Sequence, residues 1–252
     1  MLRRSVTYFV LLLLLAACTT NSKKSKEETA PEQKNVSIKY AKRFSIQELD
    51  SCTTVYLFGD RNSYDTTDIF VISRSGFKPG RQKPGTFLID GPCKKIAALS
   101  SIYASMFYEL GELQSLVAID NVDYIINPEI YVKFERGLLK ELAKSPQVDV
   151  EQTVALNPDI LFTFGMGLGE RDKDKKLVQT KIPLAISVDH LEESPLARAE
   201  WIKFFAAFVD KKQLADSMFN AVEKNYLELK DLAATQVSKP AVFTETKYGD
   251  FW

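Results

Sequence analysis

The sequence predicts an α/β fold in which helices cover both faces of a parallel sheet. Between about residues 94 and 194, short uninterrupted apolar runs such as "DILFTF" alternate with helical patterns. Strands that are apolar on both faces are typical of a parallel sheet buried between two layers of helices. A small β-rich segment precedes this region and a long helical stretch follows it, and the 252 residues suffice for one large or two small cores.

The N-terminus has the features of a bacterial lipoprotein signal. Positive charge in Met1–Arg4 is followed by an apolar stretch too short to span a bilayer, and small residues then precede Cys18. We expect residues 1–17 to be removed and lipid to be attached to Cys18, which would anchor the protein to a membrane outside the cytoplasm. The alternative is an ordinary secretory signal with a chance cysteine. Residues 18–35 are polar and charged and predict a flexible tether.

The next segment, residues 36–93, is predicted to be β-rich. Residues 53–58 and 68–73 are β-branched and aromatic runs, and the intervening "GDRNSYD" predicts a hairpin. Residues 86–89 predict a short third strand. Cys52 and Cys93 lie in this segment, and either a disulfide or two buried free thiols fits an oxidising compartment.

Strands and helices then alternate through residues 94–194. Ser100 and Ser101 are candidate N-caps of the first helix, and Gly111 is placed to end it. Pro128 fits the first turn of the second helix. The expected strands are 95–99, 116–120, 159–164 and 184–188, and the expected helices are 102–110, 127–143, 148–156 and one that begins near Glu170.

Residues 195–235 predict the longest helical stretch. Four aromatic residues recur there at helical spacing and are expected to pack in the core, with a ligand-binding role as the weaker alternative; they are Trp201, Phe204, Phe205 and Phe208. An irregularity is expected near Asp210. Residues 236–252 contain one further predicted strand, which would begin a new unit.

Composition excludes several classes of function. Lys plus Arg and Asp plus Glu are balanced at 33 each, which gives no indication of a nucleic-acid partner. His190 is the single histidine, so a metal site built from several histidines is excluded. There is no GxSxG motif, no Walker lysine in the glycine-rich stretch and no Ser-His-Asp pattern, so no enzyme is predicted.

The stretch "FTFGMGLGE" approaches a dinucleotide-binding fingerprint without completing it. Gly165, Gly167 and Gly169 alternate after an apolar strand, but the third glycine of that fingerprint is replaced by Glu170. A carboxylate at this point would repel a pyrophosphate. We therefore expect the glycines to leave the strand end open for a ligand; a nucleotide-binding or enzymatic α/β lobe that uses Gly165–Gly169 is the alternative.

The order of these segments, and most specifically "LNPDILFTFG" followed by "GE", resembles the N-terminal lobe of the ABC-importer substrate-binding proteins for iron–siderophores, haem and cobalamin. The similarity runs from about Lys94 to Trp252. The resemblance implies a Rossmann-like lobe, a rigid linker helix at about 195–235, and the start of a second lobe in 236–252. It also implies a lipid-anchored, periplasm-facing protein that delivers a metal chelate to an inner-membrane permease and its ATPase. The rest of the second lobe would follow Trp252, so the chain would be either a fragment of a longer product or a truncated form.

The resemblance also assigns roles to residues. Phe164 would pack on the ligand, and Glu170 would pair with permease arginines. Ser100, Ser101 and Tyr103 lie at the same edge of the predicted sheet, where helix capping competes with ligand binding as their role. Trp252, with Tyr248, would face the ligand from the second lobe.

Overall fold

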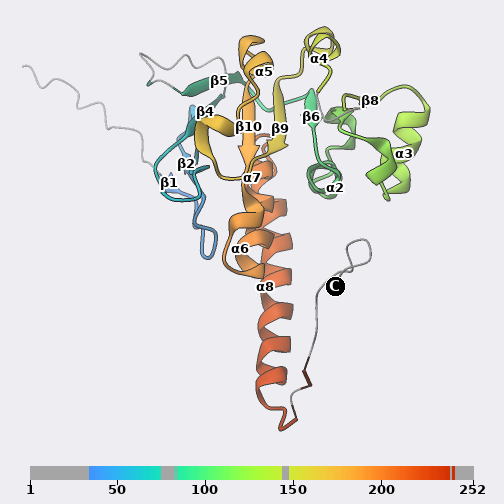
Figure 1. The fold of residues 1–252 in the computed structure, drawn as a ribbon. Coiled ribbons are helices and arrows are strands. Elements are labelled where there is room, and N and C mark those ends of the chain that lie inside the picture. Colours follow the sequence, from blue (N-terminus) through green and yellow to red (C-terminus); the bar gives the residue numbers. More distant parts are fainter. Residues whose placement is uncertain (1–33, 75–82, 84, 144–147, 239, 242–252) are drawn as a thin grey trace, which may run out of the picture. The chain divides into compact units, whose positions relative to one another are not determined.

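The computed structural model describes residues 34–74, 83, 85–143, 148–238 and 240–241. Cys18 and Trp252 lie outside these residues, as do the expected signal and most of the expected tether. Two sheets organise the described part of the chain (Figure 1).

The N-terminal sheet has the order β1-β2-β3-β4-β5. The first three pairings are antiparallel, and β5 joins β4 in parallel. The hairpin expected between the two β-branched runs is therefore confirmed, with Cys52 opposite Ser73 and Leu57 opposite Asp68. The strands are β1 (Lys34–Asn35), β2 (Phe44–Glu48), β3 (Cys52–Leu57), β4 (Asp68–Ser73) and β5 (Thr86–Asp90).

The second sheet is parallel throughout and has the order β10-β9-β6-β7-β8. Its strands are β6 (Ile96–Ala98), β7 (Leu116–Ile119), β8 (Lys140–Glu141), β9 (Ile160–Phe164) and β10 (Leu184–Ser187). Helices cover both of its faces, because Phe162 packs in one apolar cluster with Phe107 of α2 while Leu161 packs in another with Leu177 of α5. The predicted fold class is thus confirmed.

Two helices end or begin at residues other than those that the sequence predicts, and the local backbone explains both differences. The second expected helix stops at Glu135, because Gly137 adopts a left-handed conformation (φ 70°) and the chain then turns into β8. Glu170 lies in a 3₁₀ turn, and the following helix begins only at Lys175 behind the Asp174 cap. The helices of this region are α2 (Ser101–Glu109), α3 (Pro128–Glu135), α4 (Val150–Leu156) and α5 (Lys175–Gln179), with 3₁₀ turns η1 (Leu113–Ser115), η2 (Val122–Tyr124), η3 (Gly169–Asp172) and η4 (Asp189–Leu191).

The long helical stretch is interrupted rather than continuous. It comprises α6 (Pro195–Glu200), α7 (Ile202–Ala207) and α8 (Lys212–Ala234). The irregularity expected near Asp210 is present, since this residue has a φ of 55°. The four aromatic residues predicted for the core are each at most 1% exposed: Trp201, Phe204, Phe205 and Phe208.

Helix α7 packs against both sheets. Phe44 and Phe70 of the N-terminal sheet contact Trp201 and Phe208, with ring centroids 5.0 and 5.4 Å apart. Phe162 of the parallel sheet lies 5.1 Å from the same Phe208 ring. The two sheets therefore share one apolar core through α7, and the N-terminal sheet is not a detached appendage.

Two buried carboxylates also tie the start of the N-terminal sheet to the helices. Glu200, fully buried, accepts hydrogen bonds from the backbone N–H groups of residues 39–41 at 2.7–3.1 Å. Glu192, 5% exposed, accepts from the N–H groups of Lys42 and Arg43 and from the Trp201 indole. Five consecutive N–H groups, of residues 39–43, are thus held by two side chains.

The two cysteines are buried free thiols, each 3% exposed, so of the two alternatives the disulfide is not formed. Cys52 opens β3 opposite Ser73, whereas the Cys93 N–H donates to Phe208 O beside α7. Burial, assisted by the charge of Asp159, raises the pKa of the Cys93 thiol to about 12.

Both thiols are expected to resist modification in the folded protein. A thiol reagent such as dithionitrobenzoate needs access and a thiolate, and Cys93 offers neither near pH 8. Without denaturant, Cys52 and Cys93 should remain unlabelled for hours by mass spectrometry; in guanidinium chloride both should react within minutes. Labelling of either residue in the folded protein at the denatured rate would contradict this assignment.

Candidate ligand site at the carboxyl edge of the parallel sheet

The carboxyl ends of β6, β7, β9 and β10 meet at one edge of the parallel sheet, which we call the carboxyl edge. Ligands of open α/β sheets bind beyond this edge. At the end of β9 and in the turn that follows it, three large apolar side chains are exposed, and we call them the apolar rim. They are Phe164, Met166 and Leu168, at 58%, 53% and 49% exposure.

The glycines 165–169 shape the turn that carries this rim. A Cβ atom on Gly165 would lie 2.5 Å from Ile186 Cγ2 and 2.7 Å from Asp172 Oδ2, closer than side chains approach. Gly167 has a φ of 75°, which residues with side chains rarely adopt. The turn therefore needs glycine for close packing and for backbone conformation.

Two amide groups of this glycine turn already have an acceptor. The Met166 N–H donates to Asp172 Oδ1 at 3.0 Å, and the Leu168 N–H donates to Asp172 Oδ2 at 2.8 Å. A carboxylate thus occupies the position that a phosphate would need. This negative charge was expected on Glu170 and Asp172 was missed, although Asp side chains often bond backbone groups a few residues away.

Glu170 lies beside the rim with its side chain 81% exposed, and it has a partner within the chain. Its carboxylate is 2.7 Å from Lys173 Nζ, which is also 2.9 Å from the buried carboxylate of Asp68 in β4. The expected position at the start of a regular helix is wrong, because η3 is a single 3₁₀ turn.

The three residues expected at the start of α2 have different environments. Ser100 caps the helix, since its hydroxyl accepts from the Ile102 N–H at 3.3 Å. Ser101 lines a shallow pocket of about 280 Å³ at the carboxyl edge. The other residues lining this pocket are Ile102, Ser105, Met106, Glu109, Tyr124, Ile125 and Ile126.

Tyr103 does not reach the surface. It is 2% exposed, packs 5.1 Å from the Phe205 ring and donates its hydroxyl to Asp189 Oδ1 at 3.0 Å. Burial, and next the charge of Asp189, raises the pKa of Tyr103 well above its usual value. The expectation of a ligand contact is wrong for this side chain, which supports η4 from inside.

A second exposed apolar group at the carboxyl edge was not predicted. Ile102, Tyr124 and Ile126 are 55%, 67% and 98% exposed, and all three line the shallow pocket. Tyr124 and Ile126 follow β7 in "DYIIN", where three apolar residues interrupt an otherwise polar loop. That interruption is the signal by which the sequence could have identified them.

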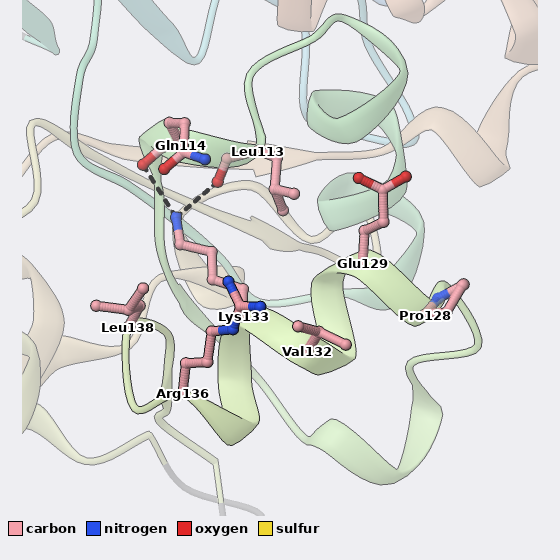
Figure 2. A pocket seen from close by; sticks show the side chains of 8 residues that line it. All are labelled: Leu113, Gln114, Pro128, Glu129, Val132, Lys133, Arg136 and Leu138. Atoms are coloured by element: carbon pink, nitrogen blue, oxygen red, sulfur yellow. Dashed lines mark hydrogen bonds between the residues drawn. The ribbon is translucent and has the colours of Figure 1, made fainter.

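Another pocket, of about 390 Å³, lies away from this edge between α3 and η1, the turn that precedes β7 (Figure 2). Lys133 points from α3 into η1, where its ammonium donates to the carbonyls of Leu113 and Gln114 at 2.6 and 3.0 Å and to Leu116 O. Burial lowers the pKa of Lys133. The lysine bonds three carbonyls in and beside η1, so its role is structural.

Two further features of the structure bear on function. Within the residues that the structure describes, no group of three His, Cys, Asp or Glu side chains could hold a metal ion. Among the helices described, none is both long and apolar enough to cross a membrane.

Comparison with known proteins places the chain in a family. A family model described as "Periplasmic binding protein" matches residues 96–252. An uncharacterized lipoprotein of Methanocaldococcus jannaschii is 26% identical over 153 residues, 56% of this chain and 36% of the relative. An uncharacterized protein of the same organism is 24% identical over 158 residues, 60% of this chain and 47% of the relative. The chain thus spans less than half the length of these curated relatives.

Among solved structures, a periplasmic binding protein from Veillonella parvula superposes with a TM-score of 0.50 and 13% identity, covering 75% of this chain and 55% of that one. This similarity concerns the fold alone. The family model spans more than half of the chain and includes the parallel sheet and all three segments of the helical stretch, α6 to α8. The chain therefore belongs to the periplasmic binding protein family, and its parallel sheet with the helices that follow is the N-terminal lobe fold of the helical-linker members.

Proposed function

We propose that this chain is the ligand-capturing N-terminal lobe of a lipid-anchored substrate-binding protein of an ABC importer. Its ligand would be an iron–siderophore, haem or a cobalamin-type molecule, delivered to an inner-membrane permease and its ATPase. Membership of the family supports the substrate-binding role. The single observation that carries the proposal is the exposed apolar rim at the carboxyl edge.

The apolar rim suits a large, flat and partly apolar ligand. The Phe164 ring ends β9 and is 58% exposed, although a phenyl group in contact with water is unfavourable by the free energy of its exposed area. A macrocycle or catecholate that lies on this ring gains burial and stacking. Tyr124 and Ile126 provide a second apolar surface at the same edge, and Trp252 would face the ligand from a second lobe.

The exposed carboxylate of Glu170 is the proposed docking group for a permease arginine. A charged group on the rim of an interface determines orientation and association rate more than affinity. Glu170 follows Met166 by four residues, so docking there would occur close to the proposed ligand site. Lipid on Cys18 would keep the protein near the permease.

Capture is proposed to involve little bending within this lobe. The linker segment α7 packs between the two sheets. Buried Glu192 and Glu200 hydrogen-bond the backbone just before β2 to Trp201 and α6. A hinge held on both sides in this way favours small closures over large rotations.

Replacing Phe164 with alanine tests the ligand site. Native mass spectrometry with cobalamin, haem and several ferric siderophores would first identify a bound chelate, and titration calorimetry would then measure its Kd. The variant should lose about 1–3 kcal/mol of binding free energy, or about 5- to 150-fold in Kd, because a desolvated aromatic contact is removed.

Two matched variants make the result interpretable. Leu88→Ala removes an apolar side chain that is 53% exposed but lies on β5 of the other sheet, so it should leave Kd unchanged. Glu170→Arg should also bind the chelate normally while abolishing stimulation of the permease ATPase. Wild-type affinity in Phe164→Ala would remove this ring from the site, and equal loss of binding and stimulation in Glu170→Arg would refute separate roles.

A further inference from the structure

We propose that Asp68, which belongs to the N-terminal sheet, sets the charge that Glu170 presents to a basic partner. The inference rests on the docking role proposed above for Glu170. It assigns to the N-terminal sheet, which precedes the region matched by the family model, a part in partner recognition.

Three charged groups form a line from the interior to the surface. Asp68 is 2% exposed, Lys173 is 16% exposed and Glu170 is 81% exposed, measured on their side chains. Lys173 Nζ lies 2.9 Å from Asp68 Oδ1 and 2.7 Å from Glu170 Oε1, so a single ammonium group bonds both carboxylates.

The summed charge of Asp68, Lys173 and Glu170 determines how strongly this part of the surface attracts a basic partner. Asp68 and Glu170 each carry one negative charge and Lys173 one positive charge, so the three groups together have a net charge of −1. Without Asp68, Lys173 would neutralise Glu170 alone and the surface would offer no net charge. The buried carboxylate therefore keeps the exposed one available for a basic partner.

Burial and pairing act in opposite directions on the two inner groups. Burial raises the pKa of Asp68 overall, and the hydrogen bond from Lys173 opposes part of that rise. For Lys173, burial acts to lower the pKa, but hydrogen bonds to Glu170 and Asp68 outweigh it and the net pKa is raised. The ammonium thus stays protonated at neutral pH.

Asp68 also lowers the cost of exchanging partners. When an arginine of the partner approaches Glu170, the carboxylate can turn toward it while Lys173 remains bonded to Asp68. Without Asp68, the same exchange would leave a largely buried ammonium unpaired, which is unfavourable. The Asp68–Lys173 pair therefore allows Glu170 to leave Lys173 and bind an arginine of the partner.

The N-terminal sheet holds the same turn at a second point. The Arg61 N–H donates to Gly167 O at 2.8 Å, and Asp60 pairs with Leu168 as an isolated antiparallel bridge. The Arg43 guanidinium in turn donates to Asp60 O at 2.7 Å. The loop before β4 therefore holds the segment that carries Glu170 without the help of Lys173, so Asp68 acts on Glu170 through its charge.

Four variants of the full-length protein test the inference: Asp68→Asn, Lys173→Gln, the double variant and Glu170→Gln. Binding to the permease–ATPase complex in lipid nanodiscs is measured by surface plasmon resonance at low and at high salt. Asp68→Asn should bind about 5-fold more weakly or worse at low salt, because the local charge falls to zero. Lys173→Gln should bind at least as tightly as the wild type, since Glu170 keeps its charge.

The double variant provides the decisive result. It restores a net charge of −1 and should bind within about 2-fold of the wild type. A purely structural role would instead make the double variant no better than Asp68→Asn, and that outcome would overturn the inference. Should Asp68→Asn fail to fold, weaker binding of Lys173→Gln than of the wild type would overturn it equally.

Glu170→Gln separates this inference from the proposed docking role. If it weakens binding while Asp68→Asn binds normally, docking stands and the role of Asp68 is wrong. If Glu170→Gln binds normally, the docking role itself is wrong. Denaturant unfolding of each variant shows whether a loss of binding reflects a loss of folded protein.

Discussion

Glu200→Ala is expected to lower the free energy of unfolding by about 3–5 kcal/mol, because it removes one partner of a buried charge pair. The Glu200 carboxylate is fully buried and accepts from the N–H groups of Lys39, Tyr40 and Ala41. It is also 2.9 Å from the ammonium of Lys203, which is 6% exposed. Alanine would leave buried donors unbonded and a buried cation without its closest carboxylate. Guanidinium chloride unfolding, followed by tryptophan fluorescence, measures the change.

Two further variants at and near this position sharpen the test. Glu193→Ala removes a carboxylate whose ion pair with Lys42 is exposed, so its unfolding midpoint should match that of the wild type. Glu200→Gln keeps a hydrogen-bond acceptor but loses the charge, so its unfolding free energy should lie between those of Glu200→Ala and Glu193→Ala. Hydrogen exchange should rise at residues 39–41 in Glu200→Ala. An unfolding free energy within about 1 kcal/mol of the wild type would show that relaxation or water replaces these bonds.

The sequence predicted the parallel sheet because its signal is local. Each of the four expected apolar runs became a strand, and caps such as Ser100 could be identified from the adjacent helix pattern. The fifth strand, β8, was missed because its two residues, Lys140 and Glu141, are not apolar and follow a helix that Gly137 ends early. Helix-forming residues continue to Ala143, so composition alone could not place that break.

The candidate site was predictable only where a single element determines it. Phe164 follows from the end of one strand. Tyr103 looked equivalent, but its hydroxyl meets Asp189, 86 residues away, and its ring meets Phe205. The Asp68–Lys173 pair joins residues 105 positions apart, one in β4 and the other directly after η3. Contacts of that kind depend on the packed structure and leave no pattern in the sequence.

The second large effect is expected for Phe162→Ala, which should destabilise the protein by about 3–5 kcal/mol. Phe162 lies at the centre of the core that the two sheets share, fully buried, with the rings of Phe107 and Phe208 each 5.1 Å away. Alanine would leave a cavity walled by rings that α2 and α7 hold in place, so the surroundings cannot close it.

The same strand offers the matched control for this prediction. Phe164 is two residues further along β9 and has the same side chain, but it lies beyond the covering helices at 58% exposure. Phe164→Ala should therefore change the unfolding free energy by less than about 1 kcal/mol while it weakens ligand binding. Phe162→Ala should lower the unfolding free energy strongly, but the molecules that remain folded should bind the ligand with the affinity of the wild type. Equal destabilisation by the two variants would mean that the Phe164 ring is part of the core, and the carboxyl edge would then lose the aromatic surface proposed for ligand capture.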